Sequence, residues 1–211
     1  MSLETKADAS AETPVVRKVT DAQALRALAH PVRIAIIETL IFGGPMTATQ
    51  VGDRIGESAT TCSFHLRQLA KYGFVEEAGG GKGRARPWRL TSIGFSIGSH
   101  EDTESELAAD ALLRVVRERQ LARFEEWLRS KASYPREWRE AADSSEYLLY
   151  LTLAELKQLS QDIHAILMPR YVERLEHPEL RPPDALPVEM LLFSYPLRHP
   201  DAEPDETPNH Q

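Results

Sequence analysis

Residues 47–72 read TATQVGDRIGESATTCSFHLRQLAKY, and this stretch decides the fold. Thr47 is a favourable N-cap for a first helix. Apolar residues then recur at helical spacing on both sides of the link at 56–58, at Val51, Ile55, Cys62, Leu66 and Leu69. The stretch therefore predicts a helix, a tight turn and a second helix over residues 59–72, with the apolar residues of both facing one core.

The residues on either side extend this pattern. Asp21 is a plausible cap for a short helix, and Pro31 suits the first turn of another that ends at Gly43-Gly44. Downstream, FVEEAGGGKGRARPWRLT (residues 74–91) predicts a β-hairpin with a glycine-rich, basic tip. Helices followed by such a hairpin predict a winged helix-turn-helix domain over residues 17–92.

Charge is distributed unevenly along the chain. The net charge is −7, yet residues 17–90 hold eleven Lys and Arg against six Asp and Glu, a local balance of +5. A basic module attached to an acidic remainder suits local contact with phosphates, with the acidic part held away from them.

The second half predicts an α+β unit, so the whole chain is expected to be mainly α with a small β content. We expect a linker over 93–103, a long dimerisation helix over 104–132, and a crossing loop over 134–144. Residues 133–198 are then expected to form a strand-helix-strand domain, with strands at 146–152 and 188–197 and a helix that begins with a Thr152–Glu155 capping box and runs to about Leu175. Residues 1–16 and 199–211 are expected to be a disordered leader and tail.

Three pieces of the first half carry a family resemblance. They are Ala-His-Pro-x-Arg at 29–33, Ser-x-His-Leu-x-x-Leu at 63–69, and Gly-Phe-Val at 73–75 before the basic hairpin. About a third of the chain thus resembles the ArsR-like winged helix-turn-helix family of bacterial repressors. The resemblance implies that helix 59–72 enters the major groove and presents Thr60, Thr61, Ser63, Phe64, Arg67 and Gln68 to DNA. The C-terminal half resembles the extension of larger members of that family.

The chemistry of these residues agrees with contact to double-stranded DNA. Thr and Ser reach base edges or phosphates, Arg67 offers a bidentate donor, and an exposed Phe64 fits a thymine methyl group. His65 either packs or contacts DNA, and the hairpin cations Lys82, Arg84 and Arg86 suit phosphates or the minor groove. The competing interpretation is a merely solvated helix face beside an ordinary hairpin tip.

Other kinds of site are less well supported. The single cysteine, Cys62, lies on the core face, and the family's usual metal ligands are missing from helices 47–56 and 104–131, so we expect no metal and no cofactor. The only metal site left open is an adventitious one at His100-Glu101-Asp102.

The G-x-S-x-G pattern of hydrolases occurs once, at Gly94-Phe95-Ser96-Ile97-Gly98. The large parallel sheet that such a nucleophile needs is not predicted, so we expect no enzyme. We find neither a secretory signal nor a membrane-spanning stretch, which predicts a cytoplasmic protein.

The function expected is a homodimeric, sequence-specific transcriptional repressor. A dimer would bury the apolar faces of the second half and place two reading helices about one DNA turn apart. An apolar group in the C-terminal unit forms either a plain core or a pocket for an unknown small-molecule effector: Leu149, Leu151, Leu167, Tyr171, Met190, Leu192 and Phe193. The alternative function is a protein-interaction module that uses the winged domain without specific DNA binding.

Overall fold

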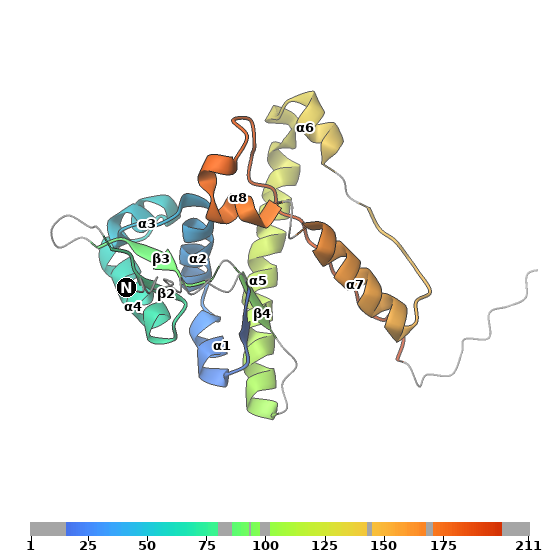
Figure 1. The fold of residues 1–211 in the computed structure, drawn as a ribbon, viewed down its shortest axis with the longest axis horizontal. Helices are drawn as coiled ribbons and strands as arrows, with labels where there is room; N and C mark the ends of the chain where they lie inside the picture. Colours follow the sequence, from blue (N-terminus) through green and yellow to red (C-terminus); the bar gives the residue numbers. More distant parts are fainter. Residues whose placement is uncertain are drawn as a thin grey trace, which may run out of the picture.

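The computed structural model describes residues 16–79, 86–92, 94–97, 102–142, 145–167 and 171–199 (Figure 1). The first half contains α1 (Ala22–Leu28), α2 (Pro31–Gly43), α3 (Ala48–Ile55) and α4 (Ala59–Lys71). Helices α3 and α4 confirm the two helices predicted over residues 47–72, and α1 and α2 confirm the two predicted before them. Strand β2 (Val75–Glu77) pairs antiparallel with β3 (Trp88–Leu90), so the predicted hairpin is confirmed as well. Residues 80–85 at its tip lie outside the described residues.

Local capping chemistry sets the ends of these helices. The Asp21 side chain accepts a hydrogen bond from the Ala24 N–H at 2.8 Å at the start of α1. Thr47 and Gln50 form a capping box at the start of α3. Gly56 ends α3 in the left-handed conformation, with φ of 74°, a value that glycine adopts at little cost. The turn between α3 and α4 is thus encoded by the residues that form it.

A short parallel pair, which the sequence did not predict, closes the domain. Strand β1 (Val16–Val19) pairs with β4 (Gly94–Ile97), in register from Val16 opposite Gly94 to Val19 opposite Ile97. Val16 was assigned to the disordered leader and 94–97 to a linker, and both assignments were wrong for these residues. The two strands are far apart in sequence, so no local turn signal connects them.

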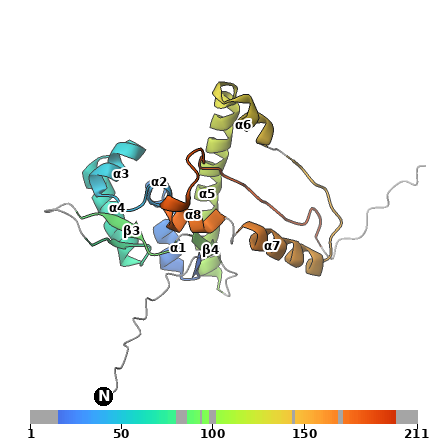
Figure 2. The same cartoon turned by 45° about the horizontal axis from the view of Figure 1, so that its top comes forward.

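One apolar core joins the helices to the hairpin. Its fully buried side chains include Leu25 and Leu28 of α1, Ile36 of α2, and Phe74 just after α4. The long helix α5 (Thr103–Ser130) lies along α1 and closes the core with Ala108, Ala109 and Leu112 (Figures 1 and 2). This confirms the long helix expected over 104–132 and shows that its first half belongs to the packed domain.

Beyond α5 the chain is helical but sparsely packed. The 3₁₀ turn η1 (Lys131–Ser133) leads to α6 (Arg136–Ala141), so the crossing loop expected over 134–144 was wrong. Next come α7 (Leu153–Leu167), α8 (Glu173–Glu176) and η3 (Pro178–Leu180). The predicted capping box is present, because the Thr152 N–H donates to Glu155 Oε2 at 2.8 Å and the Glu155 N–H donates to Thr152 Oγ1 at 3.3 Å.

The two strands predicted at 146–152 and 188–197 are not formed among the described residues. Both segments are extended and solvent-exposed, with the Tyr150 side chain 97% exposed. A strand needs a neighbouring strand to satisfy its backbone N–H and C=O groups, and neither segment has one. The predicted core or effector pocket is likewise not enclosed within this chain, since most of its members are exposed: Leu149, Leu151, Tyr171, Met190, Leu192 and Phe193.

Candidate nucleic-acid interface

Helix α4 has one buried face and one exposed face. Cys62, Leu66 and Leu69 are fully buried against the core. On the opposite side Thr60 and Arg67 are exposed, and 55% of Phe64 is accessible to solvent. The predicted division of α4 into a core face and an outward face is therefore present.

Polar contacts already organise the outward face. At the start of α4, Ser58 Oγ accepts from the Thr61 N–H at 3.0 Å and lies 2.8 Å from Thr61 Oγ1. One turn later Arg67 folds back, so that Nε donates to the Ser63 carbonyl at 3.1 Å and Nη2 to Ser63 Oγ at 3.0 Å. These exposed hydrogen bonds are weak in water, so an anion or a base edge can replace them as the partner of the Arg67 guanidinium.

The carboxyl end of α4 is held by a residue that the sequence analysis did not select. Arg17 of β1 donates from Nη1 to the Tyr72 carbonyl at 2.9 Å and to the Gly73 carbonyl at 2.7 Å. Its guanidinium also lies 4.7 Å from the centre of the Phe74 ring. A cation at this end complements the helix dipole and satisfies terminal carbonyls, so β1 fixes the direction of α4.

His65 does not belong to the outward face. It is buried, and its ring centre lies 4.6 Å from that of His30 and 5.2 Å from that of Phe64. Burial lowers the pKa of His65, and the neighbouring His30 and Arg33 lower it further. The packing role is therefore correct, and the inclusion of His65 among the DNA contacts is corrected: a neutral, buried imidazole supports α4 from behind.

The described part of the hairpin carries two arginines, and each of them pairs with a glutamate of β2. Arg86 Nη1 pairs with Glu77 Oε2 at 2.7 Å, and Arg89 Nη2 pairs with Glu76 Oε1 at 2.6 Å. All four side chains are well exposed, so these pairs exchange readily with other anions. Lys82 and Arg84 lie outside the described residues.

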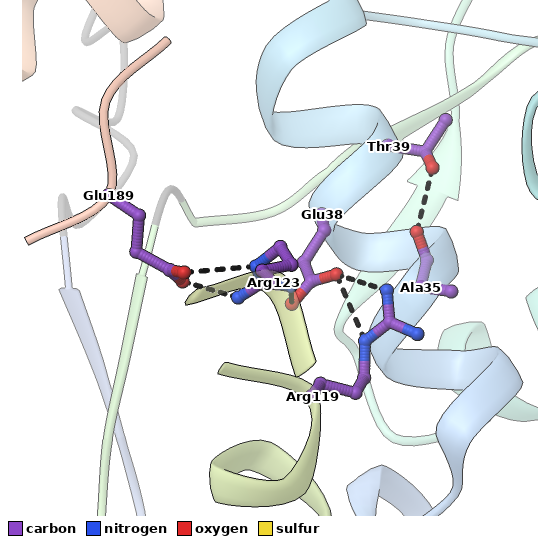
Figure 3. A network of polar contacts seen from close by, with 6 residues as sticks. All are labelled: Ala35, Glu38, Thr39, Arg119, Arg123 and Glu189. Atoms are coloured by element: carbon purple, nitrogen blue, oxygen red, sulfur yellow. Dashed lines mark hydrogen bonds and ion pairs between the residues drawn. The ribbon is translucent and has the colours of Figure 1, made fainter. Parts of the chain in front are cut away.

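A network of ion pairs positions the domain relative to α5 and the C-terminal segment (Figure 3). Glu38 of α2 accepts from Arg119 Nη2 at 2.6 Å and from Arg123 Nη1 at 2.7 Å. Arg123 also donates from Nε to Glu189 at 3.0 Å, and its bonds to Glu189 and Glu38 raise its pKa. These ion pairs thus attach α5 to α2 at Arg119 and Arg123, further along α5 than its last buried apolar residue, Leu112.

The described residues do not form the sites for metal, thiol or hydrolase chemistry that the sequence left open. No three His, Cys, Asp or Glu side chains come together there as metal ligands, and His100 and Glu101 lie outside the described ranges. Burial raises the pKa of the Cys62 thiol, which keeps it protonated and unreactive. Ser96 lies exposed within β4 rather than on a turn that follows a strand, so the geometry of a hydrolase nucleophile is not present. Across the described ranges, no helix combines the length and apolar character needed to span a bilayer.

Comparison with known proteins agrees with the class of domain that the geometry indicates. Residues 28–78 match the family model of a helix-turn-helix domain, the segment from the end of α1 to just past β2. No curated protein matches the chain. Among solved structures the chain is similar to the multiple antibiotic-resistance repressor (MarR) from Listeria monocytogenes 4b F2365, with 12% identity, a TM-score of 0.26, and coverage of 69% of this chain and 81% of that one.

The class assignment therefore depends on the family match and on the α3-turn-α4 geometry. Together they support a DNA-binding transcription regulator, in a winged helix-turn-helix fold of the α+β class. Helix-turn-helix regulators are in general not enzymes.

Proposed function

We propose that this protein is a homodimeric, sequence-specific transcriptional repressor that places α4 in the major groove of double-stranded DNA. The observation that carries the proposal is the outward face of α4: an exposed Phe64 and an exposed Arg67 on a helix whose other face is completely buried. A helix held rigidly from behind, with adaptable polar side chains and an aromatic ring in front, is suited to reading base edges. This function places the protein in the compartment that holds the genome, in agreement with the predicted cytoplasmic location.

Each side chain of this face has a defined role in the proposal. Arg67 leaves Ser63 and donates to a guanine or a phosphate, while Phe64 covers a thymine methyl group. Thr60, Thr61 and Gln68 supply short polar contacts at the two ends of the helix. His65 is not included, because it is buried.

The wing supplies contacts that do not depend on sequence. Lys82, Arg84 and Arg86 belong to a segment with a local charge of +5, and their positive charge suits the phosphate backbone or a narrow minor groove. The exposed Arg86–Glu77 pair opens at little cost when a phosphate replaces the carboxylate.

Dimerisation is supported by the apolar surface of the second half. Leu121, Phe124 and Leu128 lie three or four residues apart on α5 and are exposed. The extended segments at 145–151 and 186–197 expose a further set of large apolar side chains: Tyr147, Leu148, Leu149, Tyr150, Val188, Met190, Leu192, Phe193, Tyr195 and Leu197. A second copy that covers these faces would bury these side chains and offer a pairing partner to the extended backbone at 146–151 and 186–197. An effector pocket, if the protein has one, would then form between the two copies.

The first experiment selects fragments of the source genome that the full chain binds, and then measures affinity for the recovered site as a function of salt. Binding should weaken steeply between low and moderate salt, and the site should be roughly palindromic. Phe64→Ala and Arg67→Ala should each lose about ten-fold or more in affinity for that site, in line with about 1–3 kcal/mol for a good base contact. Arg129→Ala, which removes an exposed arginine from α5, is the matched control and should bind as the parent does.

Oligomeric state is measured separately by sedimentation equilibrium. The parent chain of 23.7 kDa should sediment at twice that mass, and Phe124→Asp should shift it toward the monomer. Phe64→Asp, the same change on α4, should abolish DNA binding while leaving the dimer intact. Binding that ignores salt and both α4 substitutions would favour the alternative function, a protein-interaction module.

A further inference from the structure

A cleft of about 250 Å³ lies beside the outward face of α4, between α1, the first turn of α2 and the end of α4. Its lining comprises Gln23, Arg26, Ala27, Arg33, Gln68 and Tyr72. The side chains of these lining residues carry two guanidinium groups, two amides and a phenol hydroxyl, and no Asp or Glu is among them. The lining therefore offers more hydrogen-bond donors than acceptors, and its ionised side chains are all positively charged.

Arg33 is the residue in this cleft whose polar groups are least satisfied. Its Nε atom is buried and has no hydrogen-bond partner among the described residues, and Nη2 reaches the Arg26 carbonyl only at 3.4 Å. Burial lowers the pKa of Arg33, and no described Asp or Glu forms an ion pair with it. By contrast Arg26 pairs with Glu104 at 2.8 Å.

The buried Nε atom of Arg33 is itself inaccessible, but the Nη2 atom is exposed and makes only the long contact to the Arg26 carbonyl, so an anion in the cleft can bind the guanidinium there and balance its charge. The planar fork of arginine matches the oxygens of phosphate, and the amides of Gln23 and Gln68 together with the Tyr72 hydroxyl can donate to the remaining oxygens. The chemistry of the lining therefore selects a tetrahedral oxyanion of the phosphate type.

We propose that this cleft binds one phosphate of the DNA backbone and so fixes the position of α4 in the groove. This inference rests on the proposed function, because it adds a contact to the same interface. Gln68 belongs both to the cleft and to the predicted outward set of α4, and it follows Arg67 directly in sequence. The cleft is open and smaller than the roughly 300–1,000 Å³ typical of sites that enclose a free ligand, which suits a group attached to a polymer.

The first test compares the salt dependence of DNA binding by the full chain and its Arg33→Gln variant, with the fragment recovered for the parent. Loss of one phosphate contact should lower the slope of log affinity against log salt by about 0.9. Arg33→Lys should keep most of the slope but bind more weakly, because it retains the charge without the fork. Arg129→Gln is the control at a distant exposed arginine, and thermal melts check that each variant is folded.

The second test uses the parent protein and requires only that the NMR resonance of the Arg33 side chain be assigned. The Nε–Hε resonance of Arg33 is followed in the parent protein during titration with the duplex and, separately, with inorganic phosphate. A shift that saturates at one duplex per dimer supports the proposal. A shift with millimolar inorganic phosphate and none with the duplex would assign the cleft to a free anion and overturn it.

The two proposals fail in different ways. If the parent binds DNA with a steep salt dependence but Arg33→Gln keeps the full slope and the Arg33 resonance does not move, the cleft contact is wrong and the regulator remains. If the parent binds no DNA at all, the proposed function itself is wrong, and the backbone contact is wrong with it.

Discussion

Replacing Glu38 with glutamine tests how firmly α5 is attached to the DNA-binding domain. The carboxylate of Glu38 accepts from Arg119 Nε at 3.1 Å, Arg119 Nη2 at 2.6 Å and Arg123 Nη1 at 2.7 Å (Figure 3). Glutamine keeps the size of the side chain and one acceptor oxygen, but removes the charge that balances two neighbouring guanidinium groups.

The expected loss follows from the number and exposure of these contacts. A hydrogen bond to a charged group contributes about 1.5–3 kcal/mol when well buried. Here the side chains are between 24% and 40% exposed, so solvent screens the interaction substantially. We expect the free energy of unfolding to fall by roughly 1–2 kcal/mol in all, which for a chain of this length lowers Tm by about 3–6 °C.

Urea unfolding and thermal melts at low salt measure this change, and a double-mutant cycle with Arg119→Gln isolates the pair. Glu126→Gln is the control, since Glu126 pairs with Arg129 three residues away on the exposed side of α5 and its loss should cost far less. A decrease for Glu38→Gln no larger than for Glu126→Gln, or a cycle with no coupling, would refute the attachment.

Three further predictions concern the stability of the domain. Arg17→Met removes two hydrogen bonds to the carboxyl end of α4 and should cost about 1–2 kcal/mol in urea unfolding, whereas Lys18→Met on the exposed side of β1 should cost little. Gly52→Ala should destabilise the protein despite the better helix propensity of alanine, because the added Cβ would lie 2.5 Å from a backbone carbonyl oxygen; an unchanged Tm would contradict this. Because the pKa of His65 is lowered in the folded state, the unfolded chain takes up its proton first as pH falls below about 6.5, and stability should be lost from there downward. The Tm of His65→Leu should therefore fall less than that of the parent between pH 7 and pH 5, and an equal fall in both proteins would contradict this.

The helices of the first half were predictable because their signals are local. Asp21, Thr47 and Gly56 act within one turn of their own positions, and the apolar spacing on α4 marks its buried face without reference to the rest of the chain. The outward face of α4 follows by elimination, with His65 as the exception. A histidine is compatible with either face, and only its packing against His30 shows which one it occupies.

The features that were missed depend on contacts between distant segments. The sequence around Val16 contains no local signal that predicts a parallel pairing with β4. Arg17 therefore could not be recognised as the residue that binds the carboxyl end of α4. A crossing loop was expected over 134–144, whereas α6 begins within this range, directly after Pro135. The strands expected at 146–152 and 188–197 have suitable side chains, but a strand also requires a neighbour, and the part of the chain that the structure describes does not supply one.

The two attachments of α5 respond differently to the solvent. Near its start the helix is held by apolar burial at Ala108 and Leu112, and about 15–20 Å further along it is held by the charges of Arg119 and Arg123. Salt screens the second attachment and leaves the first nearly unchanged. At low ionic strength both the apolar packing and the ion pairs hold α5, and its direction is fixed. At high ionic strength only the apolar packing near its start holds it, and the rest of the helix is free to tilt. A tilt of about 5° over the roughly 40 Å length of such a helix displaces its far end by about 3.5 Å, which would change the distance between the DNA-binding domain and the segments that follow α5.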